Sequence, residues 1–483
     1  MSIRKYTIIN LAGSIIPMFV TLVTVPLYLK TLGDVRYGVL SLVWLILGYF
    51  GFMEMGLGKA TANHLARLSE ASDKERGVVF WSAFSVNAVL GTIAAIILWI
   101  IGSFLLTRVL KIPAEFQAES LAALPWMIAT LPLALVSSVL NGALEGRNRF
   151  FTVNILQIAS TIVFQVAPLV IAYIYSPSLS VVIPAAVLSR AFMNIPFLVA
   201  CYSSVPLSRR PRFSREAVNS LLSYGGWVAV TGMIGPLLET IDRFLIGAIL
   251  GAQAVTHYTL PYQLVTKARV IPSSLSRALF PKFSAAHHGD ASHLAEDSFR
   301  LLVMIMTPII ILGIVLLKPF MIIWVGKDIA TIASPLGEIF LFGIWANSLA
   351  YIPYSLLQGT GRPDIVAKFH TLEIGPFLAL LWVSIHFFGL YGAAWAWTFR
   401  VLTDFIFLFR YSSMPNSSMK TMIIPAVMII SAIISLHNVA NNIWPWHAAI
   451  GAFFVIWVGL WLIRLYKGSP LSKLFYKHKT ASS

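Results

Sequence analysis

Apolar runs of about twenty residues follow one another along almost the whole chain. A helix needs roughly 20 apolar residues to cross a hydrocarbon core about 30 Å thick. The last two of these runs are short. The runs span residues 8–29, 38–58, 77–106, 121–143, 151–175, 181–205, 221–250, 254–285, 301–317, 339–357, 365–388, 391–409, 422–436 and 448–465. This pattern predicts an all-α polytopic membrane protein with about 14 transmembrane helices.

Composition excludes a soluble protein. The 483 residues are 58% hydrophobic and only 11% charged, whereas about a quarter of the residues in a soluble domain are charged. The net charge of +16 comes from Lys and Arg placed between the apolar runs. It therefore does not mark a basic domain for nucleic acid. Cys201 is the single cysteine, which excludes an intrachain disulfide and a Cys-based metal site.

The distribution of basic residues predicts the orientation of the chain. With 14 crossings, the two ends and the alternate loops lie on one side, and they carry 23 Lys and Arg against 6 in the opposite loops. Cytoplasmic loops carry such an excess, so we predict that both termini are cytoplasmic. The first run is too long for a signal peptide and lacks a small-residue cleavage site, so we interpret it as a retained first span.

Similar short motifs recur along the chain in the same order. Leu32-Gly33 corresponds to Leu250-Gly251, Arg147 to Arg362, and Arg190 to Arg400, at separations of 218, 215 and 210 residues. Transporters are often built from such duplicated halves. We predict two six-helix bundles at residues 1–217 and 218–412, related by a pseudo-two-fold axis along the membrane normal. Residues 413–483 add two helices and a basic cytoplasmic tail.

Catalytic patterns are absent from the sequence. It has no His/Cys metal-ligand spacing, no Gly-rich phosphate loop and no nucleophile motif. No loop much exceeds about twenty residues, which leaves no room for an external catalytic domain. We therefore predict that the protein is not an enzyme, has no catalytic residues and needs no metal or cofactor.

Basic residues within the apolar runs are the first candidate site residues. A charge at the centre of a bilayer costs about several kcal/mol unless it is paired or faces a water-filled cavity. Arg190 and Arg400 lie near the middle of matching runs, where they could face one lumen and bind an anionic head group. Lys267 and Arg269 are assisting candidates, although they lie roughly 160° apart around an ideal helix. Asp404, one turn from Arg400, offers a purely structural alternative as its ion-pair partner.

Four carboxylates within or near the apolar runs are candidates for coupling transport to an ion gradient. They are Asp242, Glu373, Glu54 and Asp404. Asp242 lies on a different helix face from the possible Glu239–Arg243 pair. Glu54 lies near the cytoplasmic end of its run, where contact with the interface is the alternative explanation.

Particular segments of the sequence resemble a known family. The stretches TVPLYLKTLG at 24–33, GLGKA at 56–60, SYGGW at 223–227 and IDRFLIG at 241–247 are similar to segments of the polysaccharide flippases. These proteins, which include the O-antigen flippases, belong to the multidrug/oligosaccharidyl-lipid/polysaccharide exporter superfamily. The resemblance covers essentially the whole chain. Many relatives carry an acidic residue directly before the Gly-Leu-Gly, whereas here Met55 separates Glu54 from it.

The resemblance implies two six-helix bundles around a cationic cavity and alternating access. The implied substrate is an undecaprenyl-diphosphate-linked oligosaccharide, moved from the cytoplasmic to the periplasmic leaflet of a bacterial inner membrane. The implied partners are membrane lipid, a proton or sodium gradient, and possible contacts with a polysaccharide polymerase and chain-length proteins, with no nucleic acid. Two alternatives remain open: a multidrug/cation antiporter of the same superfamily and a non-transporting component of a polysaccharide assembly complex. A polymerase or ligase would need the long catalytic loop that the chain lacks.

Overall fold

The computed structural model describes residues 3–68, 72–204, 213–285, 288–437 and 444–467. Within these ranges the regular structure is helical and contains no strand, which confirms the predicted all-α class. Some helical side chains lie outside the description as well, among them those of residues 3–15, 46–57 and 220–234. The chain divides into two compact units, Met1–Thr256 and His257–Ser483. Each unit is described by itself.

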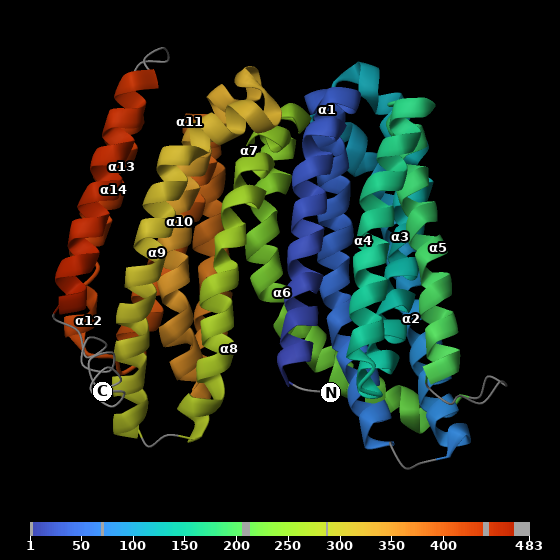
Figure 1. Ribbon diagram of the computed structural model, residues 1–483. Coiled ribbons are helices and arrows are strands. Elements are labelled where there is room, and N and C mark those ends of the chain that lie inside the picture. The colour runs from blue at the N-terminus through green and yellow to red at the C-terminus, as the bar shows by residue number, and fades with distance from the viewer. Residues whose placement is uncertain (1–2, 69–71, 205–212, 286–287, 438–443, 468–483) are drawn as a thin grey trace. The chain divides into compact units, whose positions relative to one another are not determined.

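The first unit is built from long helices that run alongside one another (Figure 1). Its central helix is α3, which packs against α1, α2 and α5. By its packing against α1, the helix α6 belongs to this unit. The elements are α1 (Ile3–Arg67), α2 (Asp73–Phe104), the π-helical turn η1 (Leu105–Val109), α3 (Ala114–Gly146), α4 (Phe150–Ile174), α5 (Leu179–Ser204), α6 (Arg215–Ile249) and the first residues of α7 (Ala252–Val265).

The second unit continues from α7 and has α10 at its centre, packed against α9 and α11. Aromatic side chains form much of its interior, where Trp397 meets the rings of Tyr262 and Phe340 edge-on. The elements are the 3₁₀ turn η2 (Thr266–Arg269), α8 (Val270–Ala285), α9 (His288–Val325), α10 (Lys327–Gly359), α11 (Pro363–Tyr411), α12 (Asn416–Lys420), α13 (Ile423–His437) and α14 (Trp444–Lys467).

Two of the helices are folded back at a glycine. Gly33 in α1 has φ 78° and Gly389 in α11 has φ 58°, a backbone conformation that glycine adopts without steric cost. Each of these helices therefore supplies two of the predicted spans. With α7, η2 and α8 counted as one segment and the five-residue α12 left aside, the described helices account for the fourteen runs. Nine helices are long and apolar enough to span a membrane in the described part of the chain.

The eighth run differs from the sequence prediction. A continuous helix was expected over residues 254–285, but the structure breaks it at Thr266–Arg269 with one 3₁₀ turn. This turn holds both Lys267 and Arg269. A short 3₁₀ stretch inside a helix often marks a hinge.

Local turns support the duplication. Gly33 and Gly251, which match in the repeat, both have positive φ, 78° and 96°. The turns that end α3 and α10 also share one hydrogen-bond pattern: Arg149 N donates to Leu144 O at 2.9 Å, and Arg362 N donates to Leu357 O at 2.8 Å. This pattern aligns Arg362 with Arg149, two residues beyond the Arg147 that the sequence repeat matches to it. The proposed bundle boundary after residue 217 and the symmetry axis stay predictions.

Small residues let the helices of the first unit approach closely. A side chain at Gly142 of α3 would lie 2.3 Å from the backbone oxygen of Gly58 in α1. Such contacts are typical of membrane helices, where small residues allow backbones to pack. This close packing brings α3, which also carries Ser137 and Asn141, against α1.

Candidate functional site

A polar cavity of about 340 Å³ lies within the first unit. Side chains of α3, α4 and α5 form most of its wall, and Pro17 of α1 contributes to it. Of the described residues that line it, Arg190 is the one charged side chain. The other lining residues are Ser137, Asn141, Gln157, Ser160, Thr161, Phe164, Asn194 and Phe197. We call this set the polar cavity.

The polar cavity arises from helical spacing on three apolar helices. Ser137 and Asn141 lie one turn apart on α3, and Arg190 and Asn194 do so on α5. On α4 the polar positions are Gln157, Ser160 and Thr161, and Phe164 follows them on the same face. Residues three and four apart share a helix face, so each helix presents a polar stripe to the same space.

Hydrogen bonds link these stripes to one another. The Ser137 hydroxyl lies 2.7 Å from Asn194 Oδ1, and Gln157 Nε2 donates to Asn141 Oδ1 at 3.2 Å. Asn194 Nδ2 also donates to the backbone oxygen of Leu133 at 3.3 Å. The amides and hydroxyls are therefore held in fixed orientations around Arg190, which suits them to a ligand with many hydrogen-bonding groups.

Arg190 is half-buried and lies near the middle of α5. At 1.5 Å per residue it is about 16 Å along the axis from the start of the helix. A guanidinium at that depth can bind a phosphate group with two parallel hydrogen bonds. The arrangement thus offers one fixed positive charge within a neutral hydrogen-bonding wall.

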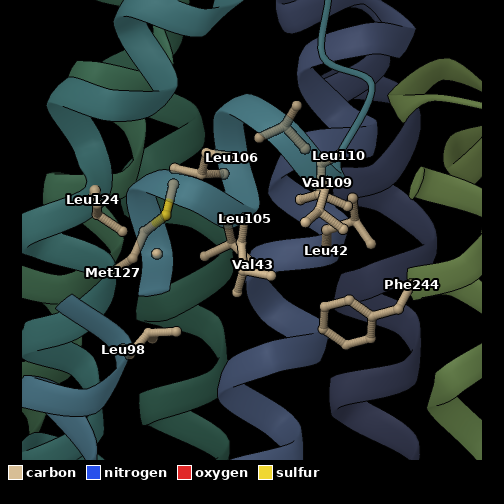
Figure 2. Close-up of a pocket in the computed structure, with 12 residues that line it drawn as sticks. Leu42, Val43, Leu98, Leu105, Leu106, Val109, Leu110, Leu124, Met127 and Phe244 are labelled. Atoms are coloured by element: carbon tan, nitrogen blue, oxygen red, sulfur yellow. The ribbon is translucent and has the colours of Figure 1, made fainter. Parts of the chain in front are cut away.

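A second pocket in the same unit has a different character (Figure 2). It measures about 50 Å³ and is lined by apolar residues of α1, α2, η1, α3 and α6, including Leu42, Leu98, Met127 and Phe244. Figure 2 shows Leu and Val side chains around it together with Met127 and the ring of Phe244, and none of the labelled side chains carries a nitrogen or oxygen atom. It can hold apolar atoms only, so the polar cavity is the better candidate site for a head group.

Arg400 lies in the second unit and has charged neighbours. Its Nη2 and Nε donate to Glu373 Oε1 at 3.3 and 3.4 Å, and its guanidinium lies 5.4 Å from the centroid of the Phe377 ring. Only 10% of the Arg400 side chain and 8% of the Glu373 side chain are exposed. Asp404, the residue expected beside Arg400, contacts His370 Nε2 through Oδ1 at 3.1 Å. Because Arg190 and Arg400 lie in different units, their shared lumen stays a prediction.

The other basic candidates, Lys267 and Arg269, share the 3₁₀ turn η2 in the second unit. Lys267 is exposed, whereas Arg269 is half-buried with its guanidinium 5.7 Å from the centroid of the Trp397 ring. A cation over an aromatic face is stabilised by the ring quadrupole. The two residues therefore have different surroundings, as their angular separation predicted, although the backbone between them is not α-helical.

The candidate coupling carboxylates are also divided between the units. Asp242 of α6 is fully buried, and its Oδ1 accepts a hydrogen bond of 2.8 Å from Arg243 N. Glu373 and Asp404 lie close together on the two halves of α11 in the second unit. The side chain of Glu54 falls outside the described residues.

Comparison with known proteins identifies the family. A family model described as "Polysaccharide biosynthesis protein" matches residues 32–333. The chain belongs to this polysaccharide biosynthesis family. A curated relative from Shigella flexneri, named "Putative O-antigen transporter", is 28% identical over 412 residues, covering 84% of this chain and 97% of the relative.

Solved structures show the same fold at low sequence identity. The structure titled "Lipid II flippase MurJ, inward closed conformation" aligns with a TM-score of 0.73 and 14% identity, covering 96% of this chain and 99% of that one. An inward-facing multidrug resistance MATE transporter aligns with a TM-score of 0.68 and 14% identity over 86% of this chain and 99% of its own. The predictions of a multi-pass membrane protein and of a non-enzymatic role are confirmed by the family and these neighbours, which are transporters and flippases.

Two features of this member of the polysaccharide biosynthesis family escaped the sequence prediction. The uncharged wall of the polar cavity was not predicted, because isolated Ser, Thr, Asn and Gln residues within apolar runs stand out less than charges do. Their spacing of three and four residues is nevertheless visible in the sequence. His370 was missed because it stands in an apolar run far in sequence from Asp404. The fold of α11 at Gly389 brings these two residues together.

Proposed function

We propose that the protein is a flippase for a polyprenyl-diphosphate-linked oligosaccharide, moving it from the cytoplasmic to the periplasmic leaflet by alternating access. The name of the Shigella flexneri relative and the family description support this substrate class. The fold shared with a lipid II flippase supports movement of a lipid-linked head group across the membrane.

The polar cavity is the observation that carries the proposal. A sugar chain presents many hydroxyls, and the amides and hydroxyls around Arg190 can hydrogen-bond them. The diphosphate presents negative charge, which the Arg190 guanidinium can bind bidentately. An antiporter of organic cations would instead be served by carboxylates, and the described wall of this cavity contains none.

The location and orientation form part of the same proposal. We place the protein in the bacterial inner membrane with both termini cytoplasmic, because the predicted cytoplasmic side carries 23 of the basic residues. In that orientation the turns at Gly33 and Gly389 are periplasmic. The substrate would then enter the first unit from the cytoplasmic ends of α3, α4 and α5.

An ion gradient is the proposed source of energy, with Asp242 as the coupling carboxylate. This side chain is fully buried in a helix of the unit that contains the polar cavity. Buried intramembrane carboxylates commonly serve as proton or cation sites in transporters. Asp242→Asn should make transport insensitive to the imposed proton or sodium gradient, whereas unchanged gradient dependence would remove Asp242 from this role.

The head-group site is tested in cells that lack the gene and regain surface polysaccharide from a plasmid copy. Arg190→Ala should abolish most of the surface polysaccharide at wild-type protein level, and Arg190→Lys should restore part of it. The matched control is Arg410→Ala, which removes an exposed arginine from the end of α11. Normal polysaccharide in Arg190→Ala cells would refute the role of Arg190.

A further inference from the structure

Three potential metal ligands come together on α11 in the second unit. His370 and Glu373 lie on its first half, and Asp404 lies on the second half beyond the fold at Gly389. One ligand atom from each of the three lies within 4.8 Å of the other two. Glu373 and Asp404 are buried, with 8% and 6% of their surfaces exposed, and His370 is half-buried.

The contacts of this cluster leave one buried oxygen unsatisfied. Glu373 Oε1 accepts from Arg400, and Asp404 Oδ1 contacts His370 Nε2 at 3.1 Å. Glu373 Oε2 is buried and has no hydrogen-bond partner within the described part of the chain. A buried carboxylate oxygen without a partner is unfavourable, so this atom is poised to take a further electropositive ligand.

The atoms that His370, Glu373 and Asp404 offer indicate which kind of ion could bind among them. Calcium and magnesium prefer oxygen ligands alone, whereas an imidazole nitrogen combined with carboxylates suits divalent transition metals such as zinc or manganese. The two carboxylates balance the charge of a divalent ion. Arg400 fits this arrangement as an outer partner, because ligating carboxylates are commonly oriented by a further hydrogen bond.

The geometry requires only a small adjustment. Ligand atoms 2.0–2.2 Å from a tetrahedral ion lie about 3.3–3.6 Å from one another. The three ligand atoms lie within 4.8 Å of one another. Bringing them to the spacing around an ion therefore takes movements of about 1 Å, which rotations about side-chain torsions can supply. The His-x-x-Glu spacing places two ligands on one helix face, and the fold at Gly389 supplies the third.

We propose that His370, Glu373 and Asp404 bind one divalent transition-metal ion, which joins the two halves of α11. The ion would hold the two spans in their present register and so stabilise this part of the second unit. The rival explanation is a closed network of two ion pairs, Arg400 with Glu373 and His370 with Asp404, that binds no ion.

The test measures zinc binding by the purified full chain in detergent after treatment with a chelator. Equilibrium dialysis with ⁶⁵Zn²⁺ should find one ion per chain. His370→Ala and Asp404→Asn should each weaken this binding at least tenfold. The matched control is His386→Ala, which removes an exposed histidine from the same helix and should bind zinc as the wild type does.

A measurement on the wild-type protein covers the case in which a variant fails to fold. Acylation of histidines by diethyl pyrocarbonate, followed by mass spectrometry, should show that zinc protects His370 and leaves His386 reactive. Absence of stoichiometric binding, equal binding by the variants, or no protection of His370 would each overturn the proposal. Zinc binding in detergent requires no transport, so this result is independent of the flippase function.

Discussion

The two arginines that the predicted sequence repeat matches, Arg190 and Arg400, have different environments. Arg190 faces a wall of amides and hydroxyls in the polar cavity, whereas Arg400 is held by Glu373 and lies near His370 and Asp404. Arg400 thus forms an ion pair with a buried carboxylate, whereas the described side chains that line the cavity with Arg190 are uncharged. The difference accords with our proposal that Arg190 binds the head group, and it leads us to propose that Arg400 serves internal charge balance in the second unit.

The largest expected difference is between the transport rates of variants that lack Arg190 and variants that lack Arg400. We expect Arg190→Ala to lower the transport rate about 10- to 100-fold, because a hydrogen bond to a charged group contributes about 1.5–3 kcal/mol. Protein level and Tm should stay near wild type. Export per molecule of protein, measured by quantitative immunoblot and polysaccharide staining, checks this. Equal transport defects in Arg190→Ala and Arg400→Ala at equal protein levels would contradict the division of roles.

Substitutions in the Arg400–Glu373 ion pair should lower the stability of the second unit. Arg400→Gln leaves Glu373 buried without its ion-pair partner, which we expect to cost about 3 kcal/mol of unfolding free energy. Glu373→Gln alone should also destabilise, and the double substitution should recover part of the loss. Thermal unfolding of the purified variants in detergent gives the coupling by a double-mutant cycle. Additive losses would show that the pair is energetically unimportant.

A carboxylate introduced beside Arg190 should give this arginine an ion-pair partner, as Glu373 is for Arg400. Asn194 lies one turn from Arg190, so Asn194→Asp places a negative charge where an i, i+4 ion pair forms. We expect about a tenfold loss of transport, because the substrate must compete with this carboxylate for Arg190. Asn194→Leu separates loss of the amide from gain of the charge, and its transport defect should be the smaller one. Equal defects in the two variants would argue against competition for the guanidinium.

Substitutions of the neutral side chains in the polar cavity should have the smallest effects on the transport rate. Ser137→Ala removes a hydroxyl that lies 2.7 Å from Asn194 Oδ1. A neutral hydrogen bond contributes about 0.5–1.5 kcal/mol, so we expect a two- to tenfold loss of transport. Initial rates over a range of substrate concentrations would show it. Ser274→Ala, which removes an exposed hydroxyl from α8 in the second unit, serves as the control and should leave the rate unchanged.

The apolar runs predicted the helices because a bilayer allows few alternatives to a helix of that length. The break at Thr266–Arg269 escaped prediction because it lies inside a stretch of residues, 254–285, that was interpreted as one helix. Tertiary packing decides such local changes in backbone hydrogen bonding. The midspan position of Arg190 was predictable from its place in the run. The neutral residues that line the cavity with Arg190, and the approach of His370 to Asp404, depend on which helix faces meet. One sequence leaves this undetermined.

Reconstitution tests the central claim most directly. Purified wild type and Arg190→Ala are placed in liposomes at equal amounts with a polyprenyl-diphosphate-linked oligosaccharide in one leaflet, and its appearance in the other leaflet is followed with an impermeant sugar-modifying reagent. We predict transfer by the wild type, little by Arg190→Ala and an intermediate rate for Arg190→Lys. Equal transfer rates for wild type and Arg190→Ala would contradict the assignment of the polar cavity as the head-group site.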